Sequence, residues 1–148
     1  MTDPRGRDWI AAFEAAVAAN LDALGDADRR AGDGDFGDNL RSALRRVHRE
    51  IEASGATEPA DVLTAVSEGF LGTGGTSGPL FGMWFRELAR AAAGGLTTGA
   101  LAAGATAGLA TVQRLGRADV GDKTMVDAMV PAATALAGAT GQPVSGAL

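Results

Sequence analysis

Aspartates are concentrated in one short stretch of the chain. Six of the twelve fall within seventeen residues, namely Asp22, Asp26, Asp28, Asp33, Asp35 and Asp38. Like charges at this density repel one another, so the stretch would be strained towards extension unless a cation lay in it. Glycine between Asp33 and Asp35 allows a tight turn with both carboxylates pointing inward, and hard oxygen ligands suit Mg²⁺ or Ca²⁺. Two interpretations stay open: a divalent-cation site, or a solvated turn in which Asp38 caps the next helix.

A glycine-rich segment spans residues 72–78 and reads GTGGTSG. One interpretation is a flexible hinge in which Thr76 or Ser77 caps a helix. The other is a phosphate cradle made of backbone N–H groups and the two hydroxyls. The segment by itself favours the hinge and helix cap.

A third segment, LGRADVGDKT, comes before the last predicted helix. Gly116 and Gly121 have the separation of a P-loop, but Asp122 stands before Lys123 and no strand is predicted upstream, so a P-loop is excluded. Lys123 is the only lysine of the chain, which is more typical of a solvated side chain than of a phosphate ligand. Asp122 is a candidate cap for the sixth helix.

An EF-hand is excluded in the same way. A calcium loop starting at Asp33 requires glycine at its sixth position and glutamate at its twelfth. The chain has Asp38 and Leu44 there.

Apolar residues recur at helical spacing in six segments. The first is predicted over residues 7–24 or a little longer, and the others centre on residues 40–51, 62–70, 80–88, 101–112 and 125–136. No segment alternates polar and apolar residues as a strand does. The fold class is therefore predicted to be all-α, an up-and-down antiparallel bundle of about six helices.

The three unusual segments form the first, third and fifth connections of this bundle. Successive helices of an up-and-down bundle reverse direction, so these connections are expected at one end. Each leads into a helix N-terminus, where unpaired N–H groups and a partial positive charge favour phosphate.

Composition narrows the function further. The 148 residues fit one domain over residues 1–148, and a net charge of −5 argues against nucleic acid as a partner. There is no cysteine, and the single histidine, His48, is expected at the border of an apolar stripe or on the surface. The uncharged stretch 91–113 is long enough to span a membrane but too rich in glycine, threonine and alanine, so no membrane span is expected. The N-terminus lacks a secretory pattern, and a cytoplasmic location is expected.

Taken together, three blocks of residues resemble one family. They are Asp28 with GDGDFGDN at 32–39, GTSGPLFG at 75–82, and GRA at 116–118 with GDKTMVD at 121–127. In this order they resemble the DhaL (Dak2-type) nucleotide-binding subunit or domain of dihydroxyacetone kinases. The resemblance runs from residue 9 to about residue 138.

The resemblance implies an antiparallel α-helical barrel with ADP or ATP and two Mg²⁺ ions at one end. The residues that match the family's metal ligands are Asp28, Asp33 and Asp35. Those that match the phosphate-binding positions are Gly37, Asp38, Asn39, Thr76 and Ser77. Gly116 and Met125 would border the nucleoside, and no residue is assigned as a catalytic base.

The resemblance also implies partners and a reaction. In the family, a phosphohistidine protein can recharge ADP in place, and the phosphoryl group then passes to dihydroxyacetone held by a separate substrate-binding subunit. This chain would be one subunit of that phosphotransferase, and we expect it to form a homo-oligomer. Two alternatives stay open: a non-catalytic nucleotide-binding or docking module that regulates a kinase or a transcription regulator, and a kinase subunit for another acceptor such as a fatty acid.

The chain departs from the family pattern in two ways. Phe36 stands where the family usually has histidine, and phenylalanine cannot donate a hydrogen bond to phosphate. The sequence also lacks about two helices that in the family carry Gly-Arg-Ala-Ser-Tyr and Asp-Pro-Gly segments. Residues 128–148 hold no charge, so we expect this stretch to be buried on most sides, covered by another chain or by further helices.

Overall fold

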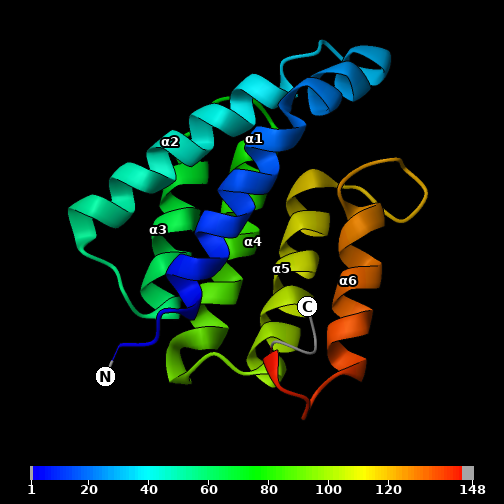
Figure 1. The fold of residues 1–148 in the computed structure, drawn as a ribbon. Helices are drawn as coiled ribbons and strands as arrows, with labels where there is room; N and C mark the ends of the chain where they lie inside the picture. Colours follow the sequence, from blue (N-terminus) through cyan, green and yellow to red (C-terminus); the bar gives the residue numbers. More distant parts are fainter. Residues whose placement is uncertain (1, 145–148) are drawn as a thin grey trace.

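The computed structural model describes residues 2–144 as a bundle of α-helices (Figure 1). The helices are α1 (Arg5–Ala31), α2 (Phe36–Ser54), α3 (Pro59–Leu71), α4 (Ser77–Ala91), α5 (Thr98–Gly116) and α6 (Val126–Gly138), with a short 3₁₀ turn η1 (Ala92–Gly94) after α4. These residues contain no strand. The predicted all-α fold class is confirmed.

The connections of the bundle lie where the alternation of helix directions predicts. Figure 1 shows the α1–α2, α3–α4 and α5–α6 connections together at the top of the molecule, and the N-terminus at the opposite end. The prediction of one shared rim is confirmed. We refer to this rim as the loop end.

Helix α1 is longer than predicted, because it continues through most of the aspartate-rich stretch to Ala31. Its last turn carries Arg29 and Arg30, whose positive charges suit the negative end of the helix dipole. The first connection, which the sequence predicts to span most of the aspartate-rich stretch (GDADRRAGDGDFGDN, residues 25–39), is therefore much shorter than expected. It shrinks to residues 32–35, and Asp28 belongs to the last turn of a helix.

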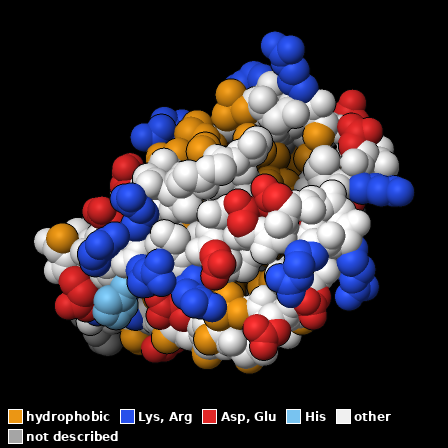
Figure 2. All heavy atoms as spheres, turned by 90° about the horizontal axis from the view of Figure 1, so that it is seen from above, with side chains coloured by type: hydrophobic (Ala, Val, Ile, Leu, Met, Phe, Trp, Pro, Cys, Tyr) orange, Lys and Arg blue, Asp and Glu red, His pale blue; other side chains and the backbone are white. Residues whose placement is uncertain are grey.

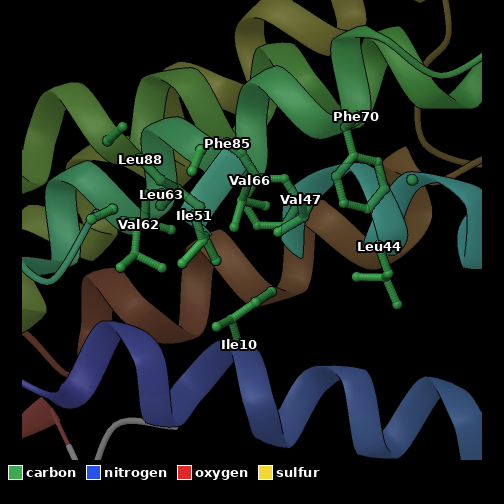
Figure 3. Packing of buried hydrophobic residues seen from close by; sticks show 14 of the residues in the cluster. Ile10, Leu44, Val47, Ile51, Val62, Leu63, Val66, Phe70, Phe85 and Leu88 are labelled. Atoms are coloured by element: carbon green, nitrogen blue, oxygen red, sulfur yellow. The ribbon is translucent and has the colours of Figure 1, made fainter. Parts of the chain in front are cut away.

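The core lies between α2, α3 and α4, with α1 packed across it (Figure 3). Val47, Val62 and Val66 are fully buried, and the Phe70 and Phe85 rings meet with their centroids 5.4 Å apart. Helices α2 and α3 approach so closely that a Cβ at Gly69 would lie 2.6 Å from the backbone nitrogen of Val47. This contact fixes the two helices that flank the first and second loops of the loop end.

Helix α6 packs on α5 through one narrow face. It buries Val126, Met129 and Ala133, while most of its other residues are exposed. The other face of α6 consists of small, uncharged side chains with no helix against it among residues 128–144, so the expected cover by another chain or by further helices stays a prediction. Residues 145–148 lie outside the described residues.

Across residues 2–144, none of the helices combines the length and the apolar character that crossing a bilayer requires.

Candidate metal and phosphate site

Three aspartates come together where α1 ends and α2 begins. Asp28, Asp33 and Asp35 each bring a carboxylate oxygen to within 4.8 Å of the other two. Asp28 is half-buried at the end of α1, and one of its oxygens accepts a hydrogen bond from the backbone N–H of Phe36 at 3.1 Å. This hydrogen bond holds the first residue of α2 against the end of α1. Asp33 and Asp35 lie in the linker between the two helices, residues 32–35, and bring their carboxylates next to that of Asp28.

No basic side chain of the described residues forms an ion pair with this cluster. Arg29, the nearest cation in sequence, pairs with Asp26 instead. Three carboxylates without a counter-charge form the donor set that a hard divalent cation such as Mg²⁺ prefers. The three predicted metal ligands are thus adjacent in space, and their chemistry fits the ion.

The two exposed carboxylates of the cluster influence each other's protonation. The backbone N–H of Asp35 donates to Asp33 at 3.3 Å, and this contact is the main cause that lowers the pKa of Asp33. The carboxylate of Asp33 in turn raises the pKa of Asp35, because it hydrogen-bonds the protonated form and repels the ionised one. A bound cation would remove this conflict by favouring the ionised form of both.

The first turn of α2 holds the next group of predicted site residues. Gly37 is buried where α2 crosses α1, and a Cβ there would lie 3.2 Å from the carbonyl oxygen of Leu21. Asn39 lies in the same first turn of α2, and its backbone N–H donates a hydrogen bond to the carbonyl oxygen of Asp35 at 2.9 Å. The interpretation of Asp38 as a helix cap is wrong, because α2 has Asp35 at its N-cap and no side-chain cap.

The glycine-rich loop meets this turn. Gly75 has a φ of 83°, and a Cβ there would lie 3.5 Å from Nδ2 of Asn39. Thr76 and Ser77 stand at the start of α4, but neither side chain caps the helix. The side-chain cap considered for either residue is therefore wrong, and the first N–H groups of α4 are free for a ligand.

Gly116 and Met125 both lie near Leu80, a residue to which the sequence analysis assigned no role in the site. A Cβ at Gly116 would lie 3.4 Å from Cδ1 of Leu80, and Met125 packs in the same apolar cluster as Leu80. Leu80 follows Ser77 by three residues, so both lie on one face of α4. That spacing is the sequence signal that places Leu80 on the side of α4 that carries Ser77.

The α5–α6 loop is organised by Asp127. Its carboxylate accepts hydrogen bonds from the backbone N–H groups of Gly121 at 2.7 Å and Thr124 at 3.1 Å, and these bonds lower its pKa. The Thr124-x-x-Asp127 spacing is that of a capping box, a sequence signal for this role. Asp122 is not the cap of α6, since its carboxylate accepts from the backbone of Asp119.

Figure 2 looks onto the loop end and shows acidic side chains near the middle of the face, beside a hollow with hydrophobic walls. The geometry thus combines a carboxylate cluster, free helix N-termini and an apolar wall at one end of the bundle. Residues 30–147 of the chain match the family described as the DAK2 domain.

The chain belongs to the DAK2 domain family.

This DAK2 domain is 32% identical over 121 residues to the PTS-dependent dihydroxyacetone kinase, ADP-binding subunit DhaL, of Lactococcus lactis, with 81% of this chain and 62% of that subunit covered. It is 38% identical over 129 residues to the D-erythrulose kinase of Mycolicibacterium smegmatis, with 81% of this chain and 22% of that protein covered. The crystal structure of the dihydroxyacetone kinase from C. freundii in complex with AMP-PNP and Mg²⁺ matches with a TM-score of 0.67 and 29% identity, over 83% of this chain and 23% of that one.

The predicted resemblance to the DhaL subunit is thereby confirmed, and the relatives of this DAK2 domain are kinases or kinase subunits. The chain spans less than two thirds of the Lactococcus subunit. The nucleotide and Mg²⁺ named for the C. freundii enzyme agree with the donor set that the carboxylate cluster and the helix N-termini supply.

Proposed function

We propose that this chain is the nucleotide-binding part of a kinase that phosphorylates dihydroxyacetone or a similar short ketose. The observation that carries the proposal is the cluster of three carboxylates beside the free N-terminus of α4. Identity to both a dihydroxyacetone kinase subunit and a D-erythrulose kinase supports a short ketose as the acceptor. Nothing in the structure favours a fatty acid.

Asp28, Asp33 and Asp35 would hold Mg²⁺, two ions in the full site. Magnesium supplies neutralisation of the phosphate charge, which is the main requirement of phosphoryl transfer. No general base is assigned, because positioning and charge carry most of this reaction.

The remaining predicted residues would bind the nucleotide itself. Thr76 and Ser77 offer hydroxyls and backbone N–H groups to the phosphates, and Gly37 and Asn39 lie across from them on α2. Asp38 is exposed and negatively charged, so we assign its contact to the backbone N–H and not to the carboxylate. Gly116 and Met125, with Leu80 behind them, would border the nucleoside.

The acceptor would be brought by a dihydroxyacetone-binding partner subunit that approaches the loop end. Leu115 and Val120 are 53% and 64% exposed, the two large hydrophobic side chains most open to solvent among the described residues, and both lie beside the α5–α6 loop. An exposed apolar pair next to the site suits a protein partner. The phosphoryl donor would be ATP or a phosphohistidine protein that recharges bound ADP.

Calorimetric titration of ADP and ATP, with and without Mg²⁺, tests the proposal. The wild type should bind only with Mg²⁺, and the Asp33→Asn/Asp35→Asn double variant should lose at least about 100-fold in affinity, more than is lost when only a supporting partner of a ligand is removed. Asp26→Asn is the matched control, because it makes the same change on a neighbouring exposed aspartate outside the cluster. Absence of binding to the folded wild type, or Mg²⁺-dependent binding that survives the double substitution, would overturn the proposal.

A further inference from the structure

The part of the loop end assigned to the nucleoside is an apolar surface, which we call the nucleoside wall. It consists of Leu80, Gly116, Ala118 and Met125. The three side chains are half-buried and pack on a small hydrophobic core beneath them, while Gly116 is exposed and leaves the backbone beside Leu80 open. The wall offers carbon atoms and one thioether sulfur, which is only a weak hydrogen-bond acceptor. Figure 2 shows hydrophobic side chains lining the hollow at this end of the molecule.

The polar side chains of the neighbouring α5–α6 loop are engaged within the loop itself. Those that form such hydrogen bonds are Gln113, Asp119, Asp122, Thr124 and Asp127. Gln113, for example, donates to the carboxylate of Asp119 at 3.2 Å, and Asp122 accepts from the backbone N–H of Asp119 at 2.8 Å. A site that selects a base by its edge needs polar groups held in place for that edge, and these side chains are held in place by the loop instead.

Most backbone N–H groups of the same loop are engaged as well. Those with a partner in the loop or at the adjoining helix ends belong to residues 117, 119, 121, 122, 124, 126, 127 and 128. Adenine and guanine differ at one ring position, where adenine carries an amino donor and guanine a carbonyl acceptor. To distinguish them, a site must place a donor or an acceptor against that position, and this loop uses most of its donors on itself.

Three nearby N–H donors outside these hydrogen bonds do not supply such a group either. Arg117 and Lys123 are exposed and have no carboxylate within 4.0 Å among residues 2–144. A long, exposed cation that nothing fixes in place adds little selectivity. The indole N–H of Trp84 is buried without a partner, but it lies against Gly108, about two helical turns from Gly116. It is covered by protein and is not open to a ligand at the wall.

We infer that the nucleoside wall binds the base by packing alone, so that the site takes adenine and guanine nucleotides with similar affinity. The inference rests on the proposed nucleotide-binding function and names its substrate class as purine nucleoside di- and triphosphates. The carboxylate cluster with Mg²⁺ and the free N-terminus of α4 would hold the phosphates. The base then adds affinity in proportion to the apolar surface that it covers, and a two-ring purine covers more of the wall than a one-ring pyrimidine.

The two ways of binding a base predict very different selectivities. A hydrophobic surface rejects an analogue of similar shape by about 100-fold at most, whereas a site built to hydrogen-bond its ligand rejects the wrong one by roughly 10⁴–10⁵-fold. The ratio of the dissociation constants for two purine nucleotides therefore distinguishes packing from recognition of the edge.

Calorimetric titration of the full chain with ADP, GDP and CDP, each with Mg²⁺, tests the inference. ADP and GDP should bind with dissociation constants within about fivefold of each other, because the wall offers no group that tells their edges apart. CDP should bind about tenfold more weakly, because its base covers less apolar surface. GDP binding at least about 100-fold weaker than ADP would overturn the inference and leave the proposed function standing. A folded chain that binds none of the three would overturn both.

Met125→Ala tests the wall directly, because it removes apolar surface and no strong hydrogen-bonding group. It should weaken ADP and GDP binding by the same factor, about tenfold, and leave the affinity for Mg²⁺–pyrophosphate, which has no base, unchanged. Met83→Ala is the matched control, since Met83 is a half-buried methionine of α4 outside the wall and its core, and it should change none of these affinities. Circular dichroism should show both variants folded. A folded Met125→Ala protein that loses affinity for ADP but not for GDP, or equally for ADP and pyrophosphate, would overturn the inference.

Discussion

Replacing Gly69 with alanine should destabilise the protein, although alanine is the better helix former. Gly69 lies in α3 where this helix crosses α2. A Cβ at this position would lie 2.5 Å from Cγ2, 2.6 Å from the nitrogen and 2.7 Å from Cα of Val47. Two of these three atoms belong to the backbone, so a side-chain rotation cannot relieve the overlap and the two helices must separate.

The size of the effect follows from two opposing terms. Forcing extra volume into a packed core costs about 1–3 kcal/mol, and the upper end applies here because the obstacle is backbone. Replacing glycine with alanine inside a helix returns about 1 kcal/mol. The net loss is about 2 kcal/mol of unfolding free energy, which for a domain of this size lowers the Tm by roughly 4–8 °C.

Thermal unfolding followed by circular dichroism measures this shift. Gly25→Ala is the matched control, because Gly25 also lies inside a helix but its Cβ would meet only the flexible side chain of Arg29, at 3.5 Å. That substitution should raise the Tm by roughly 2–4 °C. A Gly69→Ala protein with an unchanged or higher Tm would refute the close α2–α3 crossing on which the estimate rests.

Three further predictions concern the loop end. The pKa of Asp127 lies below its ordinary value of 3.8, because its carboxylate accepts hydrogen bonds from the backbone of Gly121 and Thr124. The stabilisation of the loop by this carboxylate is therefore lost as pH falls through the lowered pKa; the amide resonances of Gly121 and Thr124 should titrate with a midpoint below pH 3.8, and a midpoint above it would contradict this. Phe36→His should tighten Mg²⁺–nucleotide binding about tenfold by adding a donor to a charged ligand, with Phe36→Leu as the control that adds none; equal calorimetric affinities for the two would contradict this. Val120→Asp should lower turnover with the partner subunit and leave the nucleotide affinity of the isolated chain unchanged; a matching loss of affinity would place Val120 in the nucleotide site instead.

The helices could be predicted from sequence because each has an apolar stripe that the core requires. Leu44, Val47 and Ile51 repeat at i, i+3 and i+7 in α2 and are all buried. The end of α1 could not be predicted in this way, since its last two turns present mainly charged residues and contribute little to the core. Hydrophobic spacing identifies the part of a helix that packs, and α1 extends beyond that part.

The proximity of the candidate metal ligands could be predicted from sequence only in part. The aspartates alone left a cation site and a solvated turn open, the resemblance singled out Asp28, Asp33 and Asp35, and the structure brings these three together. Leu80 and Asp127 were not assigned roles, because an apolar residue on a helix and an acid in a first turn are both ordinary. Their roles depend on which backbone groups lie near them, and tertiary packing decides that.

The position of Asp28 on α1 has a consequence for how the cluster behaves without metal. A ligand on a linker can move away from its neighbours when no cation is present, whereas one on a helix moves only if the helix end unwinds. Asp28 is also held by the N–H of Phe36, the first residue of α2. The chain therefore pre-organises one ligand and the start of α2, and leaves Asp33 and Asp35 on the short linker to relax from their mutual repulsion. Binding of a divalent cation should then order the linker more than it orders either helix. The carboxylates of Asp33 and Asp35 repel each other and lie on the linker, so they can move apart without the cation, whereas Asp28 is fixed on α1.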